Sequence, residues 1–137
     1  LRAPMQITKG LLPHMIRQGW GRVVLISSDS ARVGSAGESV YSALKAGLLG
    51  FTKSLAREVA RDGVTVNAVC PGPTDTPMLR SVQAERPKLI ESLTRAIPMG
   101  RLATPEDVAS VVAFLCGEQA GYLTGQTFSV SGGITMI

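Results

Sequence analysis

The sequence predicts an α/β fold in which a parallel sheet carries helices on both faces. Residues 23–26 are continuously apolar, which is typical of a strand that is covered on both sides. A long helical segment separates this strand from the next one, at 64–69, and such a connection predicts a right-handed parallel crossover. With 137 residues, 45% of them hydrophobic and 18% charged, the chain should form one globular domain over 1–137. We expect half or two-thirds of an open, doubly wound sheet.

The first half of the chain alternates helix and strand signals. Residues 4–18 carry apolar side chains at mixed three- and four-residue spacings and predict a helix, which Pro13 should kink or loosen. The strand over 23–26 follows, and a second helix is predicted over 40–60 from a regular apolar face. A glycine at 63 should end that helix before the strand over 64–69.

The second half begins with a change of character. Residues 78–101 are charged, broken by prolines and only loosely amphipathic, so we expect an excursion or lid rather than sheet. Thr104 and Pro105, followed by two acids, form a helix start signal. A last strand is predicted over 126–130, which gives three strands and about four helices.

The composition excludes several classes of protein. The net charge is +4 and no dense basic run has interleaved aromatics, which disfavours a nucleic-acid partner. Cys70 and Cys116 are interpreted as small core residues, and the single His14 excludes a histidine-based metal cluster, so no metal is expected. No stretch approaches eighteen apolar residues and no signal-peptide pattern is present. We therefore expect a soluble, cytoplasmic protein with no membrane partner.

Polar residues stand where the first two strands end. Ser28 follows the first strand and Pro71-Gly72 the second, so both should face the crevice beyond the carboxyl ends of the sheet. Tyr41 and Lys45 are one helical turn apart and share a face. A nearby cationic nitrogen favours a phenolate over a phenol, which lets a tyrosine act as acid or base near neutral pH. Tyr-x-x-x-Lys alone also occurs on solvated helices, so only the combination is specific.

This combination resembles the short-chain dehydrogenase/reductase family over the whole chain, and the chain matches the C-terminal part of that family's Rossmann-type sheet. Members interconvert secondary alcohols and ketones with NAD or NADP. The resemblance implies that Ser28 hydrogen-bonds the substrate oxygen and that Tyr41 transfers the proton. It implies that Lys45 lowers the tyrosine pKa and binds the nicotinamide ribose. Ser27 is the competing serine, but the family's spacing to the tyrosine selects Ser28.

The resemblance also implies a cofactor wall at the end of the second strand. The segment after Pro71 and Gly72, including Thr74, should bind the carboxamide, and Thr76 should approach the cofactor. Tyr41 and Lys45 complete the implied cofactor contacts, and Asn67 matches a structural asparagine with no chemical role.

Other family features are not in the sequence. These are the glycine-rich turn that holds the cofactor pyrophosphate, and the residue that selects NAD or NADP. The family's catalytic asparagine would fall just before Leu1, so we expect the N-terminal cofactor-binding half to lie outside this chain. The alternative is a non-catalytic module that keeps the core and the oligomer helices but binds no cofactor.

The substrate side should be lined by the residues after Ser28, together with the 78–101 excursion. That excursion has five basic and two acidic side chains, which suggests an anionic handle such as a coenzyme A phosphate; a solvated surface is the alternative. The stretches Ser-Asp-Ser-Ala-Arg-Val-Gly, Cys-Pro-Gly-Pro-Thr-Asp-Thr and Ser-Val-Ser-Gly-Gly resemble the branch with 2-hydroxycyclohexanecarboxyl-CoA dehydrogenase, with the 3-oxoacyl reductases close behind. A hydroxyacyl-CoA is therefore a candidate substrate. The residues after Ser28 that we expect to line the substrate side are Asp29, Ser30, Arg32 and Val33.

The resemblance further implies a homotetramer or dimer in which the helices over 4–18 and 40–60 pack against symmetry mates. A strip of small residues on the second helix fits this packing, and it equally fits packing of a helix on the sheet within one subunit. The strip comprises Ala43, Ala46, Gly47 and Gly50.

Overall fold

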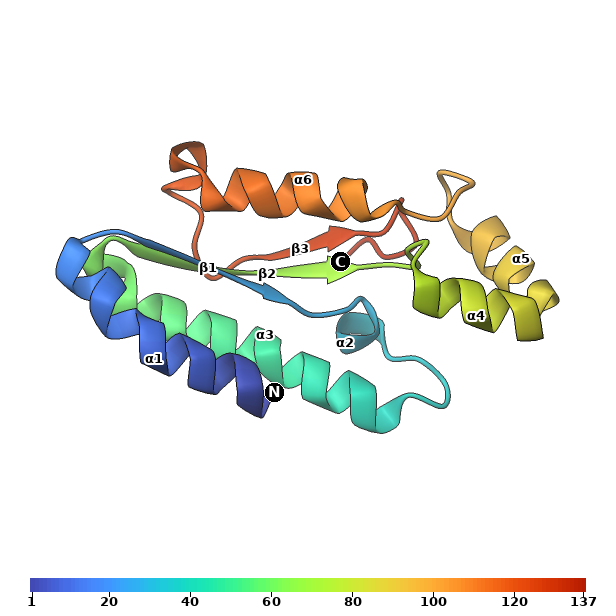
Figure 1. The fold of residues 1–137 in the computed structure, drawn as a ribbon, viewed down its shortest axis with the longest axis horizontal. Coiled ribbons are helices and arrows are strands. Elements are labelled where there is room, and N and C mark those ends of the chain that lie inside the picture. Colours follow the sequence, from blue (N-terminus) through green and yellow to red (C-terminus); the bar gives the residue numbers. More distant parts are fainter.

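The computed structural model describes all residues, 1–137, as three layers with the sheet in the middle (Figure 1). The three strands are parallel and lie in the order β1 (Gly21–Ile26), β2 (Val64–Pro71), β3 (Thr127–Val130). Two helices lie on one side of the sheet and a third lies on the other. They are α1 (Arg2–Gln18), α3 (Ser39–Val59) and α6 (Pro105–Cys116). The predicted α/β class and the parallel crossover are confirmed.

The register places β2 at the centre of the sheet. Gly21 lies opposite Val64 and Ile26 opposite Val69, while the other edge of β2 pairs with β3 from Ala68 to Pro71. Every residue from Val64 to Cys70 is buried. In contrast, β1 is an edge strand, and Ile26 at its end is 44% exposed. The prediction that β1 is covered on both faces is confirmed in part, because Val23 packs toward α3 and Val24 toward α6, although both side chains stay half-buried.

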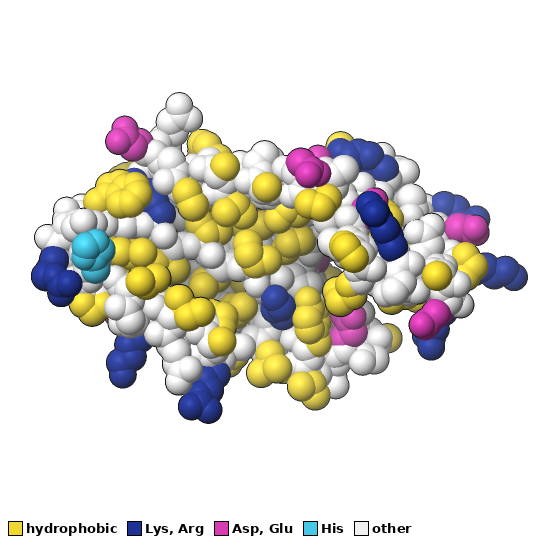
Figure 2. Space-filling view, in the orientation of Figure 1, with side chains coloured by type: hydrophobic (Ala, Val, Ile, Leu, Met, Phe, Trp, Pro, Cys, Tyr) yellow, Lys and Arg dark blue, Asp and Glu magenta, His cyan; other side chains and the backbone are white.

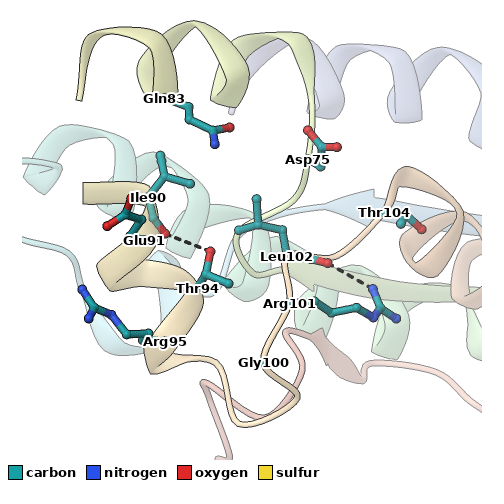
Figure 3. A pocket seen from close by; sticks show the side chains of 10 residues that line it. All are labelled: Asp75, Gln83, Ile90, Glu91, Thr94, Arg95, Gly100, Arg101, Leu102 and Thr104. Carbon is teal, nitrogen blue, oxygen red and sulfur yellow. Dashed lines mark hydrogen bonds between the residues drawn. The ribbon is translucent and has the colours of Figure 1, made fainter. Parts of the chain in front are cut away.

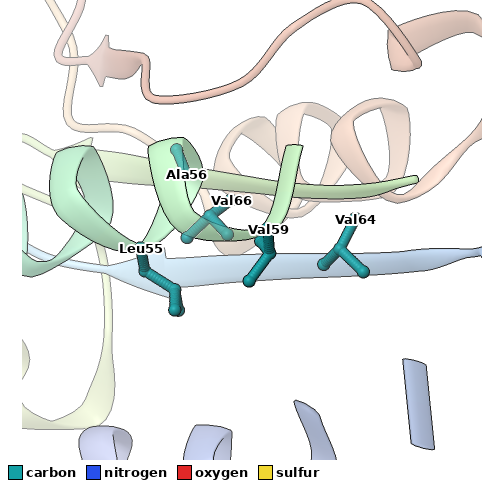
Figure 4. Packing of buried hydrophobic residues seen from close by; sticks show 5 residues of the cluster. All are labelled: Leu55, Ala56, Val59, Val64 and Val66. Carbon is teal, nitrogen blue, oxygen red and sulfur yellow. The ribbon is translucent and has the colours of Figure 1, made fainter. Parts of the chain in front are cut away.

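One hydrophobic cluster packs α3 against β2 (Figure 4). Leu55, Ala56 and Val59 come from the last turns of α3, and they pack on Val64 and Val66 of β2. The two valines are two residues apart and so point to the same face of the strand. A second cluster on the other face joins β2 to α6. Its buried members are Val69, Leu115 and Ala120.

Two glycine turns meet at the end of the sheet opposite the strand tips. Gly19 follows α1 with φ 65°. Gly63 ends the short 3₁₀ helix η1 (Ala60–Asp62) with φ 73°. A Cβ atom at Gly63 would lie 2.1 Å from the carbonyl oxygen of Gly19, so only glycine fits both the backbone and the space. The predicted glycine stop before β2 is confirmed.

The start of α6 has the predicted capping pattern. Thr104 Oγ1 accepts from the N–H of Asp107 at 3.2 Å, and Asp107 Oδ2 accepts from the N–H of Thr104 at 2.7 Å. Pro105 occupies the first turn, where its missing N–H needs no partner. This reciprocal capping box fixes where the helix begins.

The 78–101 excursion contains two helices, α4 (Pro77–Glu85) and α5 (Pro87–Ala96), beside the carboxyl ends of the strands (Figure 1). Pro87 begins α5 instead of breaking a helix. Ile90 and Ile97 are both 3% exposed, so the segment has buried apolar anchors despite its charge. With α2 (Ser30–Val33), the chain has six α-helices where about four were predicted.

Three smaller expectations can be compared directly. The α1 helix continues through Pro13 without interruption. Cys70 is fully buried, as predicted, but Cys116 is exposed at the end of α6, so its assignment to the core is wrong. None of the helices combines the length and the apolar character needed to cross a membrane.

Candidate active site

Ser28 stands at the carboxyl end of β1 between two buried neighbours. Ser27 is 3% exposed and Asp29 is 6% exposed, whereas Ser28 is half-buried. The N–H of Ser27 donates to the Val69 carbonyl at 2.7 Å, and the N–H of Asp29 donates to the Pro71 carbonyl at 3.2 Å. Ser28 Oγ accepts from the N–H of Ser30 at 3.2 Å. Ser27 and Asp29 are thus held inward, and Ser28 is left accessible.

Lys45 joins helix α3 to the end of β1. Its Nζ donates to the Ile26 carbonyl at 2.9 Å, and Ser27 Oγ donates to the Lys45 carbonyl at 2.9 Å. The same Nζ lies 5.7 Å from the ring centroid of Tyr41, which is 46% exposed. Lys45 is therefore in contact with both the Tyr41 ring and the strand end that carries Ser28. The hydroxyl of Ser27 is already engaged in this junction.

Ser28, Tyr41 and Lys45 form the first wall of the candidate site. The second wall runs from Pro71 to Thr76 after β2. The N–H of Gly72 donates to the Val130 carbonyl at 3.0 Å, and a Cβ at Gly72 would come within 2.8 Å of the Ser131 side chain. Thr74 Oγ1 donates to the Gly72 carbonyl at 2.9 Å. Thr76 Oγ1 accepts from the N–H of Leu79 at 3.3 Å and caps α4. All six residues of this wall are partly exposed.

These two walls keep hydrogen-bond donors available. An ammonium has three N–H donors, and Lys45 uses one of them on Ile26. The backbone N–H of Thr74 makes no hydrogen bond within the chain. A nicotinamide nucleotide presents ribose hydroxyls and a carboxamide oxygen, both of which accept hydrogen bonds. The donor set therefore fits the nicotinamide end of such a cofactor.

A cavity of about 600 Å³ lies beneath α4 and α5 (Figure 3). Ile90 and Leu102 supply its apolar lining, and Gln83 and Asp75 lie across from them. Ser28, Tyr41 and Lys45 are not among its lining residues. The excursion therefore borders an open cavity beside the Pro71–Thr76 wall, at Asp75.

The charge of the excursion is partly neutralised. Arg80 pairs with Asp75 at 2.7 Å and Arg101 pairs with Asp107 at 2.6 Å. The Arg80 guanidinium lowers the pKa of the Asp75 carboxyl below its usual range. Acidic and basic side chains lie close together around this end of the molecule (Figure 2). The basic residues of the excursion without an ion pair are Arg86, Lys88 and Arg95.

The loop after Ser28 contains residues whose role was missed from the sequence. Asp29 was expected to line the substrate side, but its buried carboxylate accepts a hydrogen bond from Ser129 Oγ of β3. Arg32 Nη1 donates to the same Ser129 Oγ at 2.8 Å. The physical reason is that the N–H of Asp29 is bonded to the Pro71 carbonyl, which holds this residue against the sheet. A serine inside the last strand, at 129, was the one available signal for a buried polar partner.

Asn67 has the structural role expected for it. Its Nδ2 donates to the Leu123 carbonyl at 2.8 Å, and its Oδ1 accepts from the N–H of Gln126 at 3.1 Å. Both partners lie in the segment that leads into β3. The buried amide therefore holds that segment against β2.

Comparison with known proteins places these features in context. The family model described as "Enoyl-(Acyl carrier protein) reductase" matches residues 1–135. The chain is 47% identical over 128 residues to the 3-oxoacyl-(acyl-carrier-protein) reductase FabG of Aquifex aeolicus, which covers 93% of this chain and 50% of the relative. It is 43% identical over 136 residues to the acetoacetyl-CoA reductase of Cupriavidus necator, which covers 99% of this chain and 54% of the relative.

A solved structure agrees with these relatives. A crystal structure of the TT0495 protein from Thermus thermophilus superposes with a TM-score of 0.89 at 42% identity, over 98% of this chain and 56% of that chain. The chain thus spans about half the length of the proteins it matches.

Proposed function

Because this chain belongs to the short-chain dehydrogenase/reductase family, we propose that it carries the proton-transfer residues of an NAD(P)-dependent oxidoreductase acting on a secondary alcohol or ketone. The observation that carries the proposal is the position of Lys45. Its Nζ is held 2.9 Å from the Ile26 carbonyl, two residues before Ser28, and lies 5.7 Å from the Tyr41 ring. One ammonium therefore contacts both the Tyr41 ring and the strand end that leads to Ser28.

Each of the three side chains has a separate task in this proposal. Ser28 Oγ accepts from Ser30 N–H and keeps its own O–H free to donate to the substrate oxygen. Tyr41 gives its phenolic proton to that oxygen during reduction and takes it back during oxidation. Lys45 supplies positive charge beside the tyrosine ring in either direction.

The cofactor, NAD or NADP, would supply or accept the hydride. Lys45 has two unused N–H donors for the nicotinamide ribose hydroxyls. The free N–H of Thr74 would hold the carboxamide, with Tyr41, Pro71, Gly72 and Thr76 as further cofactor contacts. We infer that the pyrophosphate-binding half of the site is supplied from outside residues 1–137.

The experiment that tests the function removes only the transferable proton. Tyr41→Phe should reduce kcat at least about 10²-fold, since general acid-base groups contribute that much or more. Circular dichroism should stay that of the parent because Tyr41 is 46% exposed and its phenolic hydroxyl makes no hydrogen bond in the chain. Tyr122→Phe is the matched control, since Tyr122 is fully exposed and should leave kcat unchanged. Activity of Tyr41→Phe within a few-fold of the parent would refute the assignment.

We propose that the substrate is a hydroxyacyl or oxoacyl thioester, such as a coenzyme A ester. The relatives named acetoacetyl-CoA reductase and 3-oxoacyl-(acyl-carrier-protein) reductase support this class. Three unpaired basic residues of the excursion, Arg86, Lys88 and Arg95, could hold the phosphates of such a carrier.

Turnover on acetoacetyl-CoA and on free acetoacetate checks the substrate proposal. We expect a higher kcat/KM for the thioester, and a smaller preference in Arg95→Gln, because Arg95 lines the cavity under α5. Arg57→Gln on α3 should keep the preference of the parent. Equal efficiency on both compounds contradicts a coenzyme A handle.

The rival function is a non-catalytic module that binds no cofactor. Titration of residues 1–137 and of a version extended upstream with NADH and NADPH, followed by nicotinamide fluorescence, separates the two functions. Binding by the extended version that weakens in Lys45→Met supports the oxidoreductase, and no binding by either version favours the module.

We also propose a cytoplasmic homo-oligomer, a tetramer or dimer, without membrane or nucleic-acid partners. An open apolar groove of about 700 Å³ between α1 and α3 supports this. Leu12 and Phe51 line the groove, and the neighbouring Ile7 and Leu11 of α1 are 63% and 54% exposed. A second copy would remove these side chains from water.

A further inference from the structure

The structure has a partly buried polar cluster beside the loop that carries Ser28, with Asp29 as its buried member. Asp29 Oδ1 accepts from Ser129 Oγ, and Ser129 Oγ accepts from Arg32 Nη1 at 2.8 Å. Arg32 Nη2 in turn donates to the backbone oxygen of Ile137. The cluster therefore connects the loop after β1 with β3 and with residues 131–137.

The segment over 131–137 also contacts the other wall of the site. Ser131 lies so close to Gly72 that a Cβ at Gly72 would come within 2.9 Å of the Ser131 Cα. The Gly132 carbonyl accepts from the N–H of Met99 at 3.1 Å, which ties in the end of the excursion. Ser131 is buried, and its Oγ accepts from the N–H of Thr135 at 3.4 Å. One segment thus touches the Ser28 loop, the Gly72 wall and the excursion.

Stability alone does not account for this cluster. Asp29 is 6% exposed, and its Oδ2 atom is buried without any hydrogen-bond partner. A buried carboxylate oxygen without a donor is destabilising, and such groups in native proteins call for a separate explanation. Asp29 also follows Ser28 directly, and its N–H fixes the loop to the Pro71 carbonyl at 3.2 Å.

Resting on the proposed function, we propose that Asp29 and Arg32 are positioning residues for Ser28. They act through Ser129 and the 131–137 segment, which together hold the serine loop and the Gly72 wall at a fixed separation. Neither residue contacts the reacting atoms. Catalysis needs this fixed separation because a displacement of about 1 Å can cost on the order of 10²-fold in rate.

Substitutions of Asp29 separate a positioning role from bulk stability. Asp29→Ala removes the acceptor for Ser129 and should lower kcat on the order of 10²-fold. It should leave KM for the nicotinamide cofactor unchanged. Asp29→Asn keeps an acceptor oxygen and should restore kcat to near the parent value. Equal losses in the two variants, or none in Asp29→Ala, would overturn the proposal. Ser129→Ala removes the same hydrogen bond with one atom and carries the test if Asp29→Ala does not fold.

A second measurement does not depend on activity. Hydrogen exchange should become faster over both 27–33 and 131–137 in Ser129→Ala and in Arg32→Met, because each breaks the connection between the segments. Arg57→Met, an exposed substitution on α3, should leave both segments at parent rates. Unchanged exchange rates in Ser129→Ala and Arg32→Met would show that the cluster does not connect the two segments. Faster exchange over both segments in these variants, together with full activity of Tyr41→Phe, would refute the proposed function. It would leave intact the inference that the cluster connects the two segments.

Discussion

At the scale of single residues, Gly63 is more constrained than its place in an exposed turn suggests. Its φ of 73° lies in the left-handed region, and the space where a Cβ would stand is occupied by the Gly19 carbonyl oxygen. The turn therefore does two things at once. It reverses the chain into β2, and it lets the turn that follows α1 pack against it.

We predict that Gly63→Ala lowers the free energy of unfolding by about 1–2 kcal/mol from the left-handed backbone alone. Displacement of the Gly19 carbonyl adds to this loss. Urea denaturation followed by circular dichroism measures it. Gly10→Ala is the control, because Gly10 lies in α1 with nothing within 4 Å of its Cβ position and should gain roughly 0.5–1 kcal/mol. Parent stability in Gly63→Ala would show that the turn can relax.

The candidate site residues differ in how visible they are in the sequence. Tyr41 and Lys45 are one turn apart on one helix, so local spacing is enough to pair them. Ser28 could be chosen over Ser27 only from a family spacing, and the structure adds a physical reason because Ser27 is buried and bonded to the Lys45 carbonyl. Asp29 could not be assigned, since its partner Ser129 lies 100 residues away.

At the scale of elements, the carboxylate of Asp107 at the start of α6 makes a pH-dependent contribution to stability. The Arg101 guanidinium, followed by the N–H of Thr104, holds the pKa of Asp107 well below its usual range. In the unfolded chain that pKa is about 3.9. Because the folded value is the lower one, the carboxylate stabilises the fold above about pH 4, and this contribution is lost as the pH falls toward the folded value.

Asp107→Asn should therefore lower Tm at pH 7 and flatten the loss of Tm between about pH 5 and pH 2. Thermal unfolding at a series of pH values measures both effects. Thr104→Ala is the control: it should destabilise by about 1 kcal/mol at all pH values and keep the acid slope, because Asp107 still pairs with Arg101. An acid slope in Asp107→Asn equal to that of the parent would rule out this carboxylate as its source.

Elements with local signals were predicted well, and those with distant ones were not. The α6 helix was expected from Thr104 and Pro105, whose capping interactions all lie within one turn. The α4 and α5 helices were not expected as such, because their charge and prolines indicate a loop. Their anchors become apolar contacts only in the folded chain, where Ile97 packs at Gly132.

At the scale of the whole molecule, the small-residue strip on α3 faces largely toward solvent in one subunit. A Cβ at Gly47 would touch the Leu1 side chain at 3.0 Å, whereas Gly50 has nothing within 4 Å. Ala43 and Gly50 are exposed. Much of the strip is thus open to solvent in one subunit, so packing of the strip on the sheet does not account for it.

We predict that Gly50→Leu lowers the oligomer mass, because the added side chain fits one subunit but obstructs a second copy against α3. Light scattering measures the mass. Gly50 is a better site than Gly47 because the Leu1 contact would confuse the result at Gly47. Ser81→Leu on the exposed face of α4 adds the same bulk elsewhere and should leave the mass unchanged. A parent mass in Gly50→Leu would contradict an interface on this helix.

The overall fold could be predicted from the sequence because an apolar strand followed by a one-faced helix recurs along the chain. Continuous apolar strands and one-faced helices predict the layers, and the right-handed crossover rule fixes how β1 and β2 pair. The environment of β1 was not predictable in the same way. Val23 and Val24 have packing partners on opposite faces, as expected, yet they are only half-buried, since burial also depends on what lies beside the strand edge.

That edge has a consequence for handling the protein. One side of β1 pairs with β2, and the backbone N–H and C=O groups on its other side have no strand beside them in the β1-β2-β3 order. An exposed edge of this kind is a template for strand addition, and β1 has no proline and only one charged residue, Arg22, to discourage it. Residues 1–137 on their own should therefore self-associate through β1 as concentration rises, with growth of intermolecular β-structure. We therefore expect the solubility of this chain to improve when the six residues of β1 are covered.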